Sequence, residues 1–242
     1  MKNIVLAIGA VAIGTSAFGQ TLMGGKLGLN YTLISTMVDP EPDEAPDQGS
    51  GIGFHIGGYV QLAISEHVGV RPEVMYSIRG FQEDRISTTS YTGPFGTTIT
   101  DRSESKNRTA YNYLEVPLLL SFQPNKKFGI QVGPGFGLLM SGRVKRSGSN
   151  TNTVTDGNSS TVTTSDFDET ISGSDVTDGL RKLEVGAVVG MIYETASGVN
   201  FGLRYWRGLN TINEDTSFGD ATVKSYTNLI QFSLGFSFIK AD

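Results

Sequence analysis

The sequence predicts an all-β protein: an eight-stranded antiparallel transmembrane β-barrel with short periplasmic turns and long extracellular loops. Three observations support this fold class. Apolar and polar residues alternate with a period of two in eight segments. The polar positions of those segments are rich in glycine and carry charges, and the connections between segments alternate between short and long. Each segment has about the length of a tilted strand that crosses a bilayer, roughly 9–11 residues.

Composition excludes several other classes. The 242 residues include 31 glycines and no cysteine, and the formal net charge is -5. Without cysteine there is no disulfide scaffold, thiolate metal site, thiol nucleophile or cysteine lipid anchor. An acidic chain without a basic stripe is a poor nucleic-acid binder, because that affinity depends on neutralising phosphates. Glycine is nearly twice its usual share of about 7% and has no collagen period, which indicates turns or closely packed strands.

The first residues have the layout of a secretory signal peptide. Lys2 gives a positive start, residues 4–14 form an apolar run, and Ala17 and Gly19 place small residues at the -3 and -1 positions of a cleavage site. The apolar run is shorter than the roughly 20 residues of a membrane-spanning helix. We therefore expect a signal peptide over residues 1–19 and an exported barrel domain over residues 20–242.

The eight predicted strands follow one another along the mature chain. In the second, Ile52, Phe54 and Ile56 alternate with Gly53 and His55. The other seven repeat this alternation, with valine, leucine, phenylalanine and tyrosine on one side and glycine or polar residues on the other. The apolar positions span, in order, residues 27–33, 52–64, 68–78, 114–122, 128–138, 183–193, 199–205 and 230–238.

The two faces of these strands predict which one meets lipid. A soluble barrel would turn its apolar face inward. Here the glycine-rich face suits a narrow interior, which needs small residues and paired charges. The apolar face has aromatic residues near the strand ends, as in the aromatic girdles of outer-membrane barrels. These aromatic residues are Tyr31, Phe54, Phe122, Phe128, Tyr193 and Tyr205.

The connections predict the orientation. Short turns are expected at residues 65–67, 123–127 and 195–198, and long loops at residues 35–50, 80–110, 141–179 and 210–224. Outer-membrane barrels have short periplasmic turns and longer extracellular loops, so both termini are expected in the periplasm. Asp156-Gly157 and Gly93-Pro94 are turn pairs between polar arms, so we expect hairpins above the membrane or disordered loops there, not a ninth and tenth strand.

Six charged residues face inward and are interpreted as a structural charge network in the lumen: Arg71, Glu73, Arg79, Glu115, Glu184 and Arg204. Charges inside a small barrel must be paired to offset desolvation. An eight-stranded barrel is also just wide enough to be filled by its own side chains. Arg71 and Glu73 share the inward parity of Glu115 on the neighbouring strand, so we expect cross-strand pairing within this group. The alternative is a catalytic or transport constellation.

Other candidate sites are weaker. His55 faces inward, but no serine motif points to it, and His67 is expected in a solvated turn. The first long loop holds acidic residues that could bind Ca²⁺, but it lacks EF-hand spacing, so a solvated loop is favoured. Those residues are Asp39, Glu41, Asp43, Glu44 and Asp47. We expect no cofactor, no metal and no enzymatic activity. For Arg143, Lys145 and Arg146, contact with lipopolysaccharide phosphates and plain solvation both stay open.

Four stretches resemble the small outer-membrane β-barrel family of Bacteroidetes-type bacteria that is often labelled PorT-like. They are residues 70–76 (VRPEVMY), residues 113–119 (YLEVPLL), Gly133-Pro134-Gly135 and residues 204–209. The resemblance covers nearly all of the mature chain and implies an eight-stranded outer-membrane barrel. It implies no single function, since some relatives assist a protein-secretion system. The long, low-complexity loop at residues 141–179 departs from the family pattern.

Three functional hypotheses follow. The first is an integral outer-membrane barrel with a filled, non-conducting lumen and a structural or surface-interaction role. The second is an accessory barrel of a secretion or envelope-assembly system, and the third is a lipid-modifying enzyme. We favour the first. The expected partners are outer-membrane lipid, lipopolysaccharide and the barrel-assembly machinery during biogenesis, with a secretion apparatus under the second hypothesis; no nucleic acid is expected.

Overall fold

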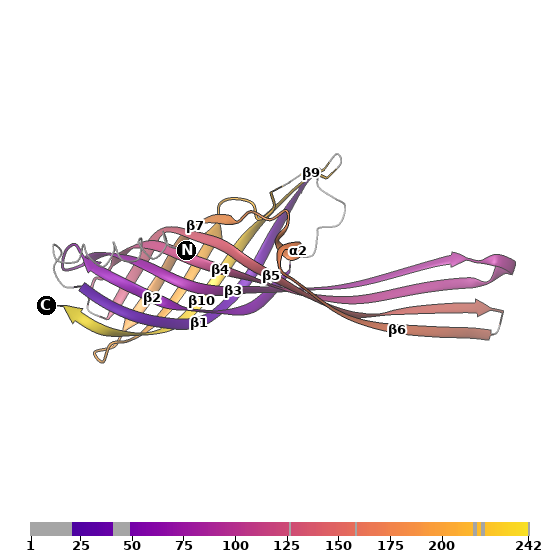
Figure 1. Cartoon of the computed structure of the whole chain (residues 1–242), viewed down its shortest axis with the longest axis horizontal. Coiled ribbons are helices and arrows are strands. Elements are labelled where there is room, and N and C mark those ends of the chain that lie inside the picture. Colours follow the sequence, from indigo (N-terminus) through magenta and orange to yellow (C-terminus); the bar gives the residue numbers. More distant parts are fainter. Residues whose placement is uncertain are drawn as a thin grey trace.

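A computed structural model describes residues 21–40, 49–125, 127–157, 159–214, 217–218 and 221–241. Eight strands of this part of the chain form a closed antiparallel ring. Their order is β1 (Thr21–Asp39), β2 (Ser50–Ala63), β3 (Val68–Thr92), β4 (Thr98–Phe122), β5 (Phe128–Asp156), β7 (Leu183–Glu194), β8 (Val199–Gly208) and β10 (Ala221–Ala241). Pairing of β1 with β10 closes the ring (Figure 1). Closure gives every ring strand two hydrogen-bonded neighbours, and it confirms the predicted fold class.

Each predicted strand segment lies within one of the eight ring strands, apart from Ile64, which lies just beyond the end of β2. Alternation also separates the faces as expected. Outward side chains such as Leu29 and Ile52 are 59% and 74% exposed, whereas the inward Lys26 and Glu115 are 5% and 0% exposed. The barrel therefore has an apolar outer surface and a polar interior.

The three short connections are turns, as predicted, but the two longest predicted loops are mostly strand. β3 and β4 continue past the barrel as one hairpin, closed by the 3-10 helix η2 (Pro94–Gly96). β5 continues to Asp156 and pairs with β6 (Ser159–Ser172). Since β4 and β5 also stay paired out to Thr98 and Thr155, the four strands form one sheet. This sheet, residues 81–92, 98–109, 143–156 and 159–172, projects away from the barrel and is called the arm (Figure 1).

The hairpin interpretation of both segments is thus confirmed, and the alternative of disordered loops is wrong. The threonine, valine and isoleucine residues of these segments suit strands. At the tip of the second hairpin, Gly157 adopts a φ of 55°, a conformation that glycine tolerates without strain. β1 and β10 also extend into segments predicted as loops, so that Asp39 pairs with Thr222.

A register shift between Asn112 and Tyr113 inserts one extra residue, Met140, into β5. The bulge reverses which β5 residues point outward beyond it. Below the bulge Leu139 is buried, and above it Gly142 is buried while Arg143 is exposed.

The remaining described elements are short. They are α2 (Ser174–Thr177) and β9 (Ser217–Phe218), which pairs with β10. No helix in the described ranges is long and apolar enough to cross a membrane. The predicted signal peptide and the acidic residues Glu41, Asp43, Glu44 and Asp47 lie outside the described residues.

Candidate functional site

The lumen contains two clusters of buried charges. In the first, Glu73 on β3 contacts three cations. Lys26 Nζ lies 2.5 Å from Glu73 Oε2, Arg71 Nε lies 2.9 Å from Oε1, and Arg204 Nη1 lies 2.5 Å from Oε2. The four side chains are at most 4% exposed. Because β3 and β8 are not neighbours in the ring, the Glu73–Arg204 pair crosses the lumen.

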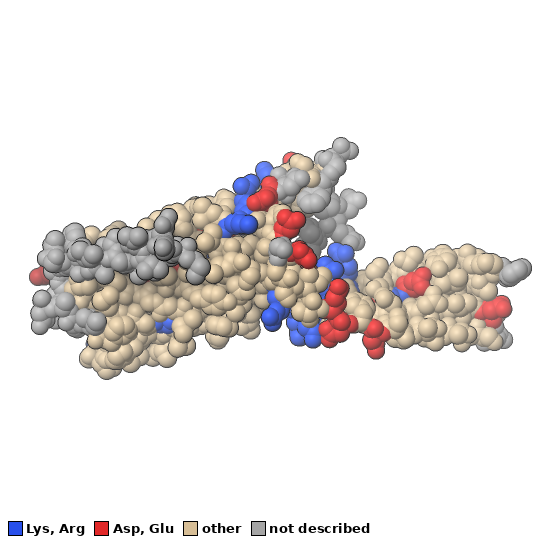
Figure 2. Space-filling model, in the orientation of Figure 1, with Lys and Arg blue, Asp and Glu red and all other residues tan. Residues whose placement is uncertain are grey.

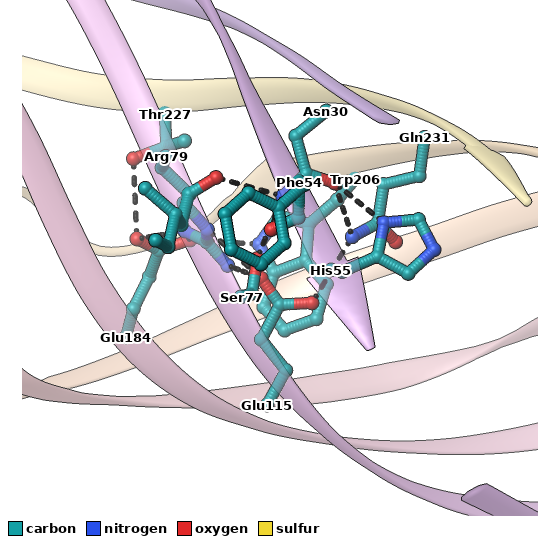
Figure 3. Close-up of polar contacts among 11 residues, drawn as sticks. Asn30, Phe54, His55, Ser77, Arg79, Glu115, Glu184, Trp206, Thr227 and Gln231 are labelled. Carbon is teal, nitrogen blue, oxygen red and sulfur yellow. Dashed lines mark hydrogen bonds and ion pairs between the residues drawn. The ribbon is translucent and has the colours of Figure 1, made fainter. Parts of the chain in front are cut away.

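The second cluster lies closer to the arm and centres on Arg79. Arg79 Nη2 lies 2.9 Å from Glu115 Oε1, and Nη1 lies 2.8 Å from Glu184 Oε2. Two neutral groups also donate to Glu184: Trp206 Nε1 to Oε1 at 2.7 Å, and Thr227 Oγ1 to Oε2 at 3.1 Å (Figure 3). These contacts join strands from several sides of the barrel.

The expected pairing of Arg71 with Glu115 is wrong, because Glu115 pairs with Arg79 instead. The register places Glu115 opposite Met75, which is equally far along β3 from Arg71 and Arg79. The Arg71 guanidinium is taken up by Glu73 and lies 3.5 Å from the centre of the Tyr59 ring. All six predicted residues are buried, but they divide into two groups.

Lys26 was missed among the predicted charges, although its alternation with Leu27 and Leu29 indicates an inward position. A neutral polar group was also missed. Asn30 and Gln231 link His55 to Glu115: His55 Nδ1 lies 2.8 Å from Asn30 Oδ1, and Gln231 Nε2 donates to Asn30 Oδ1 at 3.2 Å and to Glu115 Oε2 at 3.1 Å (Figure 3). Small polar residues on the inward face are the signal that identifies this group.

The geometry around His55 does not match a hydrolytic triad. Ser77 Oγ accepts a hydrogen bond from Asn30 Nδ2 at 2.9 Å, and His55 bonds to the same asparagine, not to the serine. A triad needs the histidine within reach of both a serine and a carboxylate. Within the described ranges, no three or more histidine, aspartate or glutamate side chains are placed to hold a metal ion.

Aromatic and aliphatic side chains fill the space between the charges. Trp206 is fully buried and packs with Leu119, Val188 and Leu229. Its indole lies directly on Gly135 and Gly186, where a Cβ would collide with the ring. The glycine-rich inward face therefore makes room for a large side chain. Arg79 lies 4.3 Å from the Tyr113 ring centre and 5.0 Å from that of Trp206.

Comparison with known proteins identifies the class. Residues 18–214 match the family described as the outer membrane protein beta-barrel domain, and the chain belongs to this family. It is therefore a β-barrel protein of the bacterial outer membrane, with the eight-stranded antiparallel ring described above.

Solved structures of outer-membrane proteins are similar at low sequence identity. Ail, the attachment invasion locus protein of Yersinia pestis, is 11% identical, with 91% of this chain and 99% of that chain covered and a TM-score of 0.35. Neisserial surface protein A is 14% identical, with 88% and 97% covered and a TM-score of 0.35. An outer membrane channel from Pseudomonas putida F1 is 9% identical, with 90% and 96% covered and a TM-score of 0.31. A comparison with curated protein sequences found no match.

Proposed function

We propose that this protein is a closed, non-conducting outer-membrane barrel that presents its arm at the cell surface, in a structural or surface-interaction role. The observation that carries the proposal is the burial of charges that face the lumen. Arg71, Glu73 and Arg79 are 1%, 1% and 2% exposed, and Glu115 is 0% exposed. A water-filled channel would leave such side chains solvated, as the polar interiors of porins are.

The charge network has a structural role in this proposal. Each buried carboxylate has cations or donors within hydrogen-bond distance, and the contacts join strands that are not neighbours. Pairing offsets the cost of removing these charges from water. Trp206 and Leu119 are buried between the charges, which supports a lumen that is filled by side chains.

The proposed orientation places both termini in the periplasm and the arm outside. In support, Thr21 and Ala241 pair with each other at the end of the barrel that has the short turns, opposite the arm. Residues 1–19 are proposed to be removed on export. The barrel-assembly machinery and outer-membrane lipid, including lipopolysaccharide, are the proposed partners. We also propose that the chain is a PorT-like member of its family, on the four stretches that resemble it. An accessory role in secretion is the competing functional proposal.

Two experiments test the proposal. Liposomes that contain the purified full-length protein should not admit small sugars, whereas a matched porin preparation should. Comparison of the secreted proteins of wild-type and deletion cells separates the two roles: an unchanged profile supports the surface role, and loss of secreted proteins supports the accessory role.

A further inference from the structure

Two chains of side-chain hydrogen bonds lie on opposite sides of the ring, one across β3, β4 and β5 and the other across β8, β10 and β1. Tyr76 donates to Asn112 Oδ1 at 2.9 Å, and Asn112 Nδ2 donates to Ser141 Oγ at 2.8 Å. Across the ring, Tyr205 donates to the Oδ1 of Asn228 at 2.7 Å, and the Nδ2 of Asn228 donates to the Oγ of Ser35 at 2.9 Å. Tyrosines with one apolar and one polar end concentrate at membrane interfaces. These chains therefore mark the outer boundary of the apolar band.

On the β3–β4–β5 side, cations follow directly above this boundary. Below it, Leu118 and Met140 are exposed apolar residues on the outward face. Above it, Arg143 lies opposite Ala110, and Lys145 lies opposite Arg108. Arg108, Arg143 and Lys145 are named the rim cation patch. Figure 2 shows charged side chains gathered where the barrel meets the arm, while the visible barrel surface is largely uncharged.

The bulge at Met140 determines the membership of the patch. Because it reverses the alternation of β5, Arg143 and Lys145 share the outward face with Arg108, and Arg146 lies on the other face of the arm. Of the three cations that the sequence places beyond the fifth strand, Arg146 therefore lies on the other face, and Arg108 joins Arg143 and Lys145 on the outward face.

The patch has an excess of positive charge. Arg108 and Lys145 are direct cross-strand partners, an arrangement of like charges that destabilises a sheet unless an anion compensates it. Lys145 lies 3.1 Å from Asp168, but the two side chains are 49% and 61% exposed, so the pair is weak. Arg108 donates to the neutral Gln82 at 3.1 Å. Within the described part of the chain, no carboxylate lies within 4.0 Å of a nitrogen of Arg108 or Arg143.

We propose that the rim cation patch binds the phosphate groups of lipid A in the outer leaflet. Arg143 lies about 7 Å along the strand above the boundary, and Arg108 and Lys145 lie about 14 Å above it, by the usual rise of a strand. Strand tilt lowers these heights, and long cationic side chains reach back toward an interface. The acyl chains then contact the apolar band while the phosphates meet the cations. This inference rests on the proposed function, because it requires the arm to lie outside.

The test compares two triple variants of equal charge. Arg108→Gln/Arg143→Gln/Lys145→Gln removes the patch. The control, Arg85→Gln/Arg102→Gln/Arg146→Gln, removes three arm cations that lie on the other face or farther out. Binding of lipid A to the full-length protein in mild detergent is measured by titration. Each cation near an anionic membrane surface contributes roughly fivefold in affinity, so the patch variant should bind on the order of 100-fold more weakly. The control should bind within about twofold of wild type.

Two further probes identify the ligand chemistry. Lipid A stripped of its phosphates should bind the wild-type protein as weakly as intact lipid A binds the patch variant. Inorganic phosphate alone should not compete at millimolar concentration. Equal affinity of both triple variants, or full binding of the dephosphorylated lipid, overturns the proposal, and competition by phosphate points to a free-anion site instead.

Folding is checked by resistance to SDS, and Arg143→Gln alone, an exposed single change, gives a second test with an expected loss of roughly fivefold. If the two triple variants bind lipid A equally while the barrel stays closed and resistant to SDS, only the proposal for the rim cation patch is overturned. Admission of sugars by wild-type liposomes overturns the proposed function and leaves the binding comparison intact.

Discussion

Arg79 and Glu184 hold each other across the lumen: Arg79 Nη1 donates to both oxygens of the Glu184 carboxylate, at 2.9 and 2.8 Å. β4 and β5 separate their strands in the ring, so the contact joins parts of the wall that are not neighbours. Glu115 completes the bridge, since Arg79 Nε also donates to its Oε1 at 2.9 Å. An interior of this kind stabilises the barrel only while every charge keeps its partner.

Removal of one member should therefore be costly. Glu115→Ala leaves the buried Arg79 with one carboxylate and Gln231 with one partner fewer. Breaking a buried pair in this way costs about 3–5 kcal/mol, whereas the exposed turn change Glu66→Ala should stay within about 0.5 kcal/mol. Urea unfolding of the folded barrel measures both. Equal midpoints for the two variants would contradict a structural role for Glu115.

The partner of Glu115 can be identified by a double-mutant cycle. Arg79→Met combined with Glu115→Ala should destabilise less than the sum of the single changes, because neither residue then leaves the other unpaired. Arg71→Met combined with Glu115→Ala should be additive, since Arg71 contacts Glu73. Additivity of the first pair would contradict the contact between Arg79 and Glu115. Strong coupling of the second pair would support the pairing expected from the sequence.

The members of the Glu73 cluster should contribute unequally to the free energy of unfolding. Glu73→Gln leaves Lys26, Arg71 and Arg204 without their shared carboxylate, so a loss of about 3–5 kcal/mol is expected. Lys26→Met keeps similar volume and removes one of three cations, so its cost should stay below about 1.5 kcal/mol. The free energy of unfolding is measured for both variants. A Lys26→Met barrel that is less stable than the Glu73→Gln barrel would mean that the ammonium group is the essential partner.

Trp206 gives a steric prediction. Gly186→Ala adds a Cβ that collides with the indole, and overpacking of this kind costs about 1–3 kcal/mol. Gly25→Ala is the matched control, because its Cβ would make only ordinary contacts of 3.8 Å. The temperature at which the barrel loses its SDS-resistant gel mobility should be lower for Gly186→Ala than for the wild-type protein. For Gly25→Ala it should be unchanged. In a Trp206→Leu background, Gly186→Ala should cost less than it does in the wild-type protein, because the indole that its Cβ meets is gone.

The ring strands are predictable from the sequence because each separates lipid from lumen. Apolar and polar residues therefore alternate along each strand with a period of two. Side chains of the arm are exposed on both of its faces, so neighbours such as Thr88 and Thr89 show no alternation of polarity. The sequence therefore predicts only hairpins or disordered loops there. Lys26 could have been found by its position in the pattern. The Arg79–Glu115 pairing depends on register and on the direction of each side chain, and the face of Arg143 depends on the bulge at Met140. Neither property follows from residue spacing.

Recording of ionic current across planar bilayers tests the filled lumen most directly. With the full-length protein inserted, shown by SDS-resistant protein recovered from the same vesicles, the account predicts a flat baseline at moderate voltage, because Trp206, Tyr113 and the two charge clusters occupy the interior. Large, steady conductance steps from the wild-type protein would contradict it and require a wider, water-filled barrel.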